Sequence, residues 1–358
     1  MKITIDTHTL AGTATGIPRY VRNLVQGVEE LDVSGLEVHK VDGGITGDLK
    51  TYERVWWEMN TLPKLVNEAS SDLFHVPGFG VRKVKGKKTI ITAHDIIGYL
   101  FPENLSFTAR AYWGKWLPHT YKQADHLITV SEHSKRDLVE HLGIPEEKVS
   151  VTYLGVDPGC EKVAMDVAVD NIVNELNLTD PYFLFIGTIE PRKNLIRTLK
   201  AYRAARLQHN DFPKLVVVGA RKWGTKEFER AIRELELEQD VITTGFVSDE
   251  LLVSLYTCAR AVVFVSTYEG FGLPLLEAFH FGAPVLASNN SSLGELGKDT
   301  AYLVNPYSVE QISTAMINLF RDDKLCEELS SKGLKRAEDF SWKKTAEQTV
   351  EVYKKVLS

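Results

Sequence analysis

The chain has 358 residues, of which 44% are hydrophobic and 25% are charged, a composition typical of a soluble globular protein with room for two domains. Its net charge of −6 argues against a general nucleic-acid binder. The three cysteines are too far apart for a disulfide framework or a zinc site, and no apolar run approaches the ~20 residues of a membrane span, so we expect a cytoplasmic protein.

The first half of the chain alternates short apolar runs with amphipathic stretches. Residues 3–6 are predicted to form a strand, and a loop with Gly12 and Gly16 leads from it into a helix over 17–31. The Gly-x-x-x-Gly spacing differs from the dinucleotide fingerprint, which disfavours a nicotinamide cofactor. Further strands are expected at 73–77, 89–93, 126–130 and 149–152. Strands that alternate with helices predict a mainly parallel sheet covered on both faces.

The second half repeats this plan, with strands expected at 182–187, 214–219, 241–244, 261–265, 284–287 and 301–304. Between the halves, the segment from Asp157 to Asp180 begins with Pro-Gly and loses strand character, so we place the domain boundary there. We predict an α/β fold of two doubly wound, Rossmann-like domains that face each other across a cleft. The domains are residues 1–165 and 181–340, with a linker over 166–180 and a final helix over 341–358.

One stretch of the second half carries most of the chemistry. After the strand that ends at residue 265, two glycines precede Pro274, which suits the start of a helix. The backbone N–H groups of Gly270, Phe271, Gly272 and Leu273, together with the helix dipole, predict an anion site. Glu269 and Glu277 flank this site, and their carboxylates suit the hydroxyls of a sugar or ribose attached to a phosphate. The alternative is a Gly-Pro turn with two solvated glutamates, because glycine loops alone are weak signals.

Several motifs in this order resemble the retaining glycosyltransferases of family 4, which have the GT-B fold, and the resemblance covers nearly the whole chain. Glu269 and Glu277, with seven residues between them, resemble the family's Glu-x7-Glu motif. Other matching segments are Gly12 to Tyr20, Thr92 to Asp95, Val130 to Lys135, Tyr153 to Asp157 and Phe185 to Asn194. The resemblance implies an acceptor-side N-terminal domain, a nucleotide-sugar-binding C-terminal domain, and a final helix that crosses back to the N-terminal domain.

The resemblance also implies roles for the diphosphate-binding turn. Gly187 and Thr188 belong to this turn, and Arg192 and Lys193 would hold the nucleotide diphosphate, where cations can stabilise the charge that develops on the β-phosphate. The commoner family pattern has arginine where Thr188 stands. Either Arg192 takes over that role or Lys222 is a further candidate cation. The alternative is a solvated Arg-Lys pair on a turn.

The remaining candidate residues are implied by the same resemblance. Glu277 would accept ribose hydroxyls, Glu269 would bind hydroxyls of the transferred sugar, and backbone near Val247 would contact the base. Gly16 is placed at the donor by its glycine loop. His94 would face the donor sugar through a hydroxyl contact or its carbonyl, and Asp95 would orient that imidazole or meet the acceptor. A purely structural histidine at the strand end is the alternative.

The sequence contains no Asp-x-Asp pair, which metal-dependent sugar-nucleotide enzymes commonly use to bridge a divalent ion to the diphosphate. We therefore expect no metal and no cofactor, with protein cations in that role. No residue is a confident carboxylate nucleophile for a double displacement. The family resemblance favours front-face attack, in which the leaving phosphate takes the proton of the acceptor.

Two segments bear on the acceptor side. Residues 81–88 carry five basic side chains, and Tyr112 to Trp116 places two tryptophans beside further basic residues. They could touch an anionic membrane with a lipid-linked acceptor, which would place the protein peripherally at its inner face, or they are a solvated hairpin and core tryptophans. The sequence does not indicate a role for Trp56 and Trp57.

These observations predict a retaining glycosyltransferase that moves a hexose from a nucleotide diphosphate sugar to a saccharide or lipid-linked saccharide. The turn Gly187 to Asn194 most resembles mannosyltransferases of bacterial surface-polysaccharide assembly, so GDP-mannose is the first donor expected. One alternative is a sugar-nucleotide epimerase of the same architecture, which needs an acid and a base astride the sugar. Another is a non-catalytic sugar-nucleotide binding protein.

Overall fold

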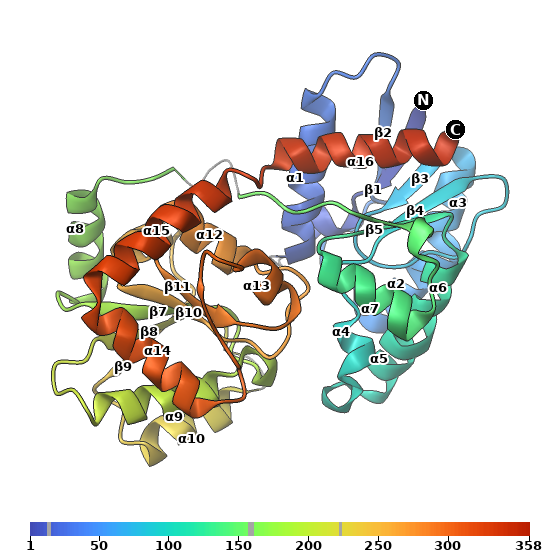
Figure 1. Ribbon diagram of the computed structural model, residues 1–358. Helices are drawn as coiled ribbons and strands as arrows, with labels where there is room; N and C mark the ends of the chain where they lie inside the picture. Colours follow the sequence, from blue (N-terminus) through green and yellow to red (C-terminus); the bar gives the residue numbers. More distant parts are fainter. Residues whose placement is uncertain (13–15, 157–160, 222–223) are drawn as a thin grey trace. The chain divides into compact units, whose positions relative to one another are not determined.

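The structure is a computed structural model, and it describes residues 1–12, 16–156, 161–221 and 224–358 (Figure 1). Two compact units divide the chain, one formed by Met1–Gly155 with Phe340–Ser358 and the other by Val156–Asp339. Each unit contains a six-stranded parallel sheet flanked by helices. The predicted α/β class and the parallel sheets are confirmed.

The sheet of the N-terminal unit has the order β2-β1-β3-β4-β5-β6. Its strands are β1 (Lys2–Asp6), β2 (Glu37–Val41), β3 (Leu73–Val76), β4 (Lys88–Thr92), β5 (His126–Thr129) and β6 (Val149–Val151). The inner strands β3 and β5 are buried at every position, which is why they stand out in the sequence as apolar runs. The edge strand β2 is mostly polar and exposed, and it was not predicted.

The helices of this unit are α1 (Gly16–Glu30), α2 (Thr51–Trp56), α3 (Leu62–Glu68), α4 (Ile97–Leu100), α5 (Phe107–Ala111), α6 (Leu117–Gln123), α7 (Glu132–Leu142) and α16 (Trp342–Leu357). Short 3-10 turns are η1 (His8–Ala11), η3 (Pro102–Asn104) and η5 (Glu146–Lys148). The last helix, α16, packs against α1, and the Tyr353 hydroxyl lies 2.7 Å from Nδ1 of His75 on β3. The chain end is therefore part of the N-terminal unit.

Two π-helical turns, η2 (Trp57–Thr61) and η4 (Tyr112–Trp116), interrupt the helices of this unit. One buried carboxylate joins them: Glu58 accepts hydrogen bonds from the Tyr112 hydroxyl and from the Trp116 indole N–H, each at 2.5 Å. Burial raises the pKa of the Glu58 carboxyl to about 7, although these donors act in the opposite direction. Glu58 thus stabilises two wide turns whose shape no sequence pattern indicates.

We expect Glu58→Ala to lower the free energy of unfolding by about 2 kcal/mol, because the variant leaves the buried donors of Tyr112 and Trp116 without their acceptor. Chemical denaturation at neutral pH measures this loss. Tyr112→Phe removes one donor and keeps the carboxylate, so it is the matched control. Equal losses in the two variants would contradict the bridging role of Glu58.

The sheet of the C-terminal unit has the order β12-β11-β10-β7-β8-β9. Its strands are β7 (Tyr182–Ile186), β8 (Lys214–Val218), β9 (Val241–Gly245), β10 (Ala261–Phe264), β11 (Val285–Ser288) and β12 (Tyr302–Val304). Its helices are α8 (Met165–Leu176), α9 (Leu195–Arg206), α10 (Thr225–Glu234), α11 (Asp249–Cys258), α12 (Leu273–Phe281), α13 (Ser291–Leu296), α14 (Val309–Arg321) and α15 (Asp323–Ala337), with the 3-10 turn η6 (Pro191–Lys193). Leu199 of α9, Phe228 of α10 and Met316 of α14 share one core with the sheet.

The boundary between the units differs in position from the predicted one. It falls between Gly155 and Val156, not after residue 165. Residues 166–180, which we expected to be a linker, include most of α8, and this helix packs on α11 with a hydrogen bond from Asn171 Nδ2 to Ser254 Oγ at 3.0 Å. The weak strand signal in this segment reflects a helix.

The strand order of the C-terminal unit also indicates where a ligand would bind. The strands β7 and β10 are neighbours in the sheet, although two strands separate them in sequence. The chain therefore leaves β7 toward one side of the sheet and leaves β10 toward the other, which opens a crevice at the carboxyl ends of these two strands. The two motifs predicted to bind the donor follow these two strands.

Candidate active site

The turn after β7 and the loop after β10 meet through their charged side chains. Arg192 Nη1 lies 2.5 Å from Glu269 Oε2, and Lys193 Nζ lies 2.7 Å from Glu269 Oε1. Lys193 is 9% exposed and Glu269 is 7% exposed, so water screens these pairs little. The structure thus brings together two predicted motifs that lie 76 and 77 residues apart in the chain.

Backbone contacts fix this arrangement. Asn194 ends η6 with a left-handed conformation, φ 62°, and its side-chain amide donates to the carbonyls of Val265 at 2.9 Å and Pro306 at 2.7 Å. The backbone N–H of Thr267 donates to the Arg192 carbonyl at 2.9 Å. Asn is tolerated at positive φ, and here its amide also holds the two turns together. Sequence analysis quoted Asn194 only as the end of a motif and gave it no role.

The loop before α12 has the predicted strand-turn-helix form. Gly272 has φ 124°, a backbone conformation that requires glycine, and a Cβ atom at this residue would also lie 2.7 Å from Leu293 Cδ2 and displace that side chain. Gly270 and Phe271 are buried, Leu273 is half-buried, and Pro274 lies in the first turn of the helix. The side chain of Ser292 donates to the Glu269 carbonyl at 2.9 Å. These contacts set the start of α12 firmly beside Glu269.

A fourth charge completes the cluster: Arg192 Nη2 lies 2.5 Å from Glu190 Oε1. Burial alone would raise the pKa of the Glu269 carboxyl, but Lys193 and Arg192 lower it to about 2. Glu269 is therefore ionised at neutral pH. The cluster contains two carboxylates and two cations. Arg192 and Lys193 are therefore held in position, and the carboxylates offset their positive charge. No pattern in the sequence distinguishes Glu190 from other polar residues of the turn.

The low pKa of Glu269 predicts how stability depends on pH. Its carboxyl group has a pKa of about 2 when folded and 4.5 as its ordinary value, so its stabilising contribution is complete above about pH 4.5 and is lost as the pH falls toward 2. We expect Glu269→Gln to lose less of its free energy of unfolding than the wild type between these pH values. Urea denaturation at several pH values measures this, and parallel curves for both proteins would contradict it.

Glycines line the carboxyl ends of the strands next to this cluster. Gly187 follows β7 with φ 148°, and Gly219 follows β8 with φ 143°. A Cβ atom at Gly219 would lie 2.1 Å from the Gly187 carbonyl oxygen, so the two backbones can approach only without side chains. Thr188 and Val247 are half-buried in the loops after β7 and β9. This edge presents mainly backbone, as contact with a phosphate or a base requires.

Glu277 lies one turn inside α12 and not at its very start. Its side chain is 6% exposed, and Oε2 accepts a hydrogen bond from the Tyr256 hydroxyl of α11 at 2.6 Å. Tyr256 thereby fixes the direction of the carboxylate, a role that no spacing in the sequence indicates. Lys222, the alternative cation, lies outside the described residues.

The predicted residues of the N-terminal unit lie at the carboxyl ends of its strands. His94 follows β4, and Nε2 donates to the Pro77 carbonyl at 3.0 Å, while burial lowers the pKa of the imidazole to about 4. His94 is therefore neutral. Asp95 Oδ1 accepts from the backbone N–H of Ile97 at 2.9 Å, and Gly16 is exposed at the start of α1. The roles implied for these three residues stay predictions.

A buried pair at the end of β1 was missed in the sequence. His8 Nδ1 lies 2.8 Å from Asp6 Oδ1, and the imidazole ring lies 5.2 Å from the ring of Trp57. An Asp-x-His pattern directly after a strand is the signal that could have found it. Among the described residues, no group of three or more His, Cys, Asp or Glu side chains is arranged to hold a metal ion.

The two segments that could touch a membrane are largely engaged within the unit. Val81 and Val84 are buried, and the ammonium group of Lys87 donates to the Ala69 and Ser71 carbonyls. Trp113 and Trp116 pack against the core. In the part of the chain that the structure describes, no helix has the length and apolar character to span a membrane.

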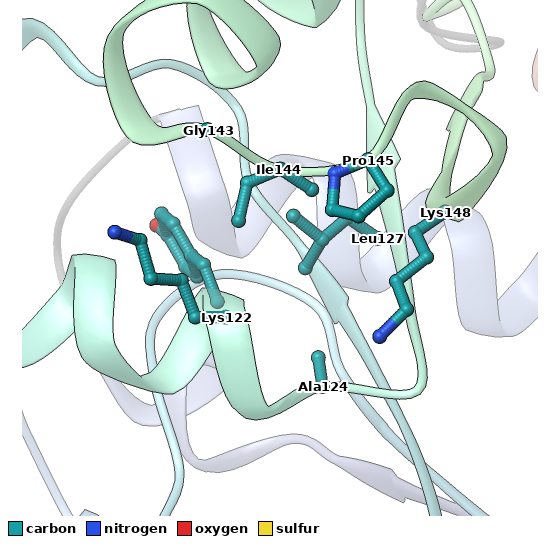
Figure 2. A pocket seen from close by; sticks show the side chains of 8 residues that line it. Lys122, Ala124, Leu127, Gly143, Ile144, Pro145 and Lys148 are labelled. Carbon is teal, nitrogen blue, oxygen red and sulfur yellow. The ribbon is translucent and has the colours of Figure 1, made fainter.

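A hollow of about 280 Å³ in the N-terminal unit is shown in Figure 2. Lys122 and Ala124 precede β5, and Lys148 precedes β6, so the hollow lies at the amino ends of the strands. Doubly wound sheets bind their ligands at the opposite, carboxyl edge. The position of this hollow therefore does not favour a catalytic role.

Comparison with known proteins gives two family matches. Residues 169–336 match the family model described as glycosyl transferases group 1, and residues 14–159 match the model described as glycosyltransferase family 4. The O-antigen chain mannosyltransferase B of Escherichia coli is 30% identical over 282 residues, which are 79% of this chain and 74% of that protein. The serotype-specific mannosyltransferase WbdA of Escherichia coli is 30% identical over 279 residues, which are 75% of this chain but 34% of that longer protein.

Among solved structures, Alr3699/HepE of Anabaena in complex with UDP-glucose superposes with a TM-score of 0.77. The match covers 99% of this chain and 100% of that one at 19% sequence identity. At this identity the similarity concerns the fold.

Proposed function

The chain belongs to glycosyltransferase family 4 and has the GT-B fold, and from this membership we propose that it transfers mannose from GDP-mannose to a saccharide or lipid-linked saccharide. Its glycosyltransferase class follows from the family; the donor and the acceptor are our proposal. The similarity to O-antigen mannosyltransferases supports mannose. The observation that carries the proposal is the contact of Arg192 and Lys193 with Glu269 at the strand crossover between β7 and β10.

In this proposal the diphosphate of the donor binds beside Arg192 and Lys193, next to the glycines at the carboxyl ends of β7 and β8. Departure of the nucleotide leaves negative charge on the β-phosphate, and a buried ammonium group stabilises that charge more than an exposed one does. Glu269 orders both cations before the donor arrives, and its carboxylate can also accept a hydroxyl of the transferred sugar. Glu277 accepts the ribose hydroxyls.

We further propose that the reaction retains the anomeric configuration by front-face attack. The acceptor hydroxyl forms the new glycosidic bond on the face from which the phosphate departs, the bond between the anomeric carbon and the phosphate oxygen breaks, and the leaving phosphate takes the acceptor proton. The pairing of Glu269 with two cations favours this route over a double displacement, because a carboxylate held by two cations is a weak nucleophile.

We propose that transfer needs no divalent metal, because Arg192 and Lys193 occupy the place where a metal would neutralise the diphosphate. We expect turnover in EDTA to remain within about twofold of turnover in Mg²⁺, since no metal-bridged charge is lost. Product formation with and without chelator measures this. Loss of activity in EDTA with recovery on addition of Mg²⁺ or Mn²⁺ would contradict it.

Thermal-shift screening of nucleotide sugars tests the donor. A ligand that binds only the folded protein raises its melting temperature according to the ratio of concentration to Kd. We expect GDP-mannose to raise it more than UDP-glucose does, and transfer of mannose to an oligosaccharide should follow in a product assay. A larger shift with UDP-sugars would overturn the donor assignment and leave the transferase class intact.

The family does not favour the two alternatives. The matched relatives described above are named as transferases. An epimerase would convert GDP-mannose without any acceptor, and a binding protein would shift its melting temperature without consuming the donor. Both outcomes are visible when the donor is followed in the absence of an acceptor.

Contact with an anionic membrane is a weaker part of the proposal. Arg82 and Lys85 are exposed in the basic segment, whereas Lys83 and Lys88 lie near Asp125 at 3.6 and 4.0 Å. All four side chains are exposed, but the nearby Asp125 carboxylate offsets the charge of Lys83 and Lys88, which limits the attraction of the segment to anionic lipid. Flotation of the protein with anionic vesicles tests this membrane contact. If an Arg82→Ala and Lys85→Ala double variant floats as the wild type does, these two residues do not contribute to membrane binding.

A further inference from the structure

A groove in the N-terminal unit takes no part in the donor chemistry proposed above. It has a volume of about 550 Å³ and lies between the loop after β2 and the helix α2. This volume is within the range of small-molecule binding sites. The lining residues that matter here are Ile45, Leu49, Tyr52, Glu53, Trp56 and Trp57.

The groove has exposed aromatic walls and a buried aromatic floor. Trp56 is 66% exposed and Tyr52 is 68% exposed, whereas Trp57 is 4% exposed. Large aromatic side chains gathered around a groove are more informative than single exposed apolar residues. The π-helical turn η2 starts at Trp57, so the helix changes its geometry between the two tryptophans. One ring therefore remains at the surface while its neighbour enters the core.

The walls are held in position, although they face solvent. The Tyr52 hydroxyl donates to Glu53 Oε1 at 3.0 Å, and Glu53 Oε2 accepts from the backbone N–H of Lys50 at 2.8 Å. The buried indole N–H of Trp57 has no hydrogen-bond partner within the described ranges. An unpaired buried donor costs free energy, which the packing of the Trp57 ring in the core offsets.

The groove lies at the functional edge of its sheet. Its first lining residue, Gly43, comes two positions after the end of β2, and the backbone N–H of Thr7 after β1 donates to the Val41 carbonyl at 2.8 Å. His8, which follows β1, contacts Trp57. The strands β1 and β3 are neighbours at which the strand order reverses, so the floor of the groove adjoins the position where such sheets bind ligands.

We propose that this groove binds a pyranose ring of the saccharide acceptor, stacked on Trp56 or Tyr52; the proposal rests on the transferase function above. One face of a pyranose presents C–H groups that pack on an aromatic ring, and its hydroxyls need polar partners at the rim, which Glu53 and Thr61 supply. The described lining contains a carboxylate and no basic side chain. An anionic lipid headgroup would need the opposite charge.

Binding is tested on the full-length protein without donor, using tryptophan fluorescence. The probes are a mannose disaccharide, a mannose trisaccharide, maltose and cellobiose. We expect Trp56→Ala to weaken binding of the saccharide that the wild type prefers by about tenfold, and Trp56→Phe by less than about threefold, because an aromatic face is retained. Phe107→Ala is the matched control, since Phe107 is 87% exposed in the same unit and does not line the groove.

The kinetic readout separates this proposal from the proposed function. With donor present, we expect Trp56→Ala to raise KM for the acceptor about tenfold and to leave KM for the donor unchanged. If transfer occurs and the acceptor KM of Trp56→Ala equals that of the wild type, the groove proposal is wrong while the transferase function stands. If no donor is consumed but saccharide binding depends on Trp56, the transferase function fails, and the groove is a saccharide site but not an acceptor site.

Two further outcomes overturn the groove proposal. The first is the absence of Trp56-dependent binding to every saccharide of the panel. The second is a Trp56-dependent fluorescence change with vesicles of neutral or anionic phospholipid and none with saccharides, which would identify the groove as a membrane contact. Circular dichroism of Trp56→Ala should match the wild type, because this side chain is mostly exposed.

Discussion

Lys193→Ala is expected to lower kcat about a hundredfold to a thousandfold while KM for the donor changes much less, since the loss of one preorganised donor at a site of developing charge has an effect of this size. The ammonium group of Lys193 is buried, lies 2.7 Å from Glu269 and stands 4.9 Å from the ring centroid of Phe264. In the proposed mechanism it stabilises the departing phosphate more than the bound donor, because the charge on the phosphate grows as the bond breaks.

Steady-state kinetics with GDP-mannose and a saccharide acceptor measure this change. Lys200→Ala is the matched control, because Lys200 is an exposed lysine of α9 in the same unit. It should leave kcat unchanged. A Lys193→Ala enzyme with normal kcat and a raised donor KM would show that Lys193 binds the donor without stabilising the departing charge.

The sequence predicted the two segments of this site and not their contact. The strand before Gly187 and the strand before Glu269 are recognisable because both are continuous apolar runs; the first ends at a glycine and the second at polar Ser266. The ion pairs join residues 76 and 77 positions apart, and periodicity contains no information on such a distance. Only the strand order, with β7 beside β10, places them together.

Other features were hidden because their sequence signals are weak or common. The edge strand β2 has three polar residues among five and no buried position, so its pattern resembles a loop. The π-helical turns depend on Glu58, a residue that looks like any surface glutamate in the sequence and is 1% exposed in the fold. Tyr256 acts on Glu277 from a different helix. Residues that act through tertiary contacts cannot be identified from local patterns.

Glu277→Ala is expected to raise KM for the donor about fiftyfold and to change kcat less than Lys193→Ala does, because a hydrogen bond to a charged group contributes about 1.5–3 kcal/mol. The ribose hydroxyls that Glu277 is proposed to accept do not change charge during transfer, so in this role it would bind the ground state and the transition state alike. Its carboxylate is directed by the Tyr256 hydroxyl at 2.6 Å. Tyr256→Phe should raise the donor KM in the same direction by a smaller factor.

Glu250→Ala serves as the control, since Glu250 is an exposed glutamate in the first turn of α11. Donor titration by calorimetry gives the affinity independently of turnover, and it should fall for Glu277→Ala as KM rises. The comparison with Lys193→Ala is decisive, because one side chain is assigned to binding and the other to the departing charge. Identical changes of kcat and KM in the two variants would refute the division of roles, since a site that merely needs intact charge would respond to both in the same way.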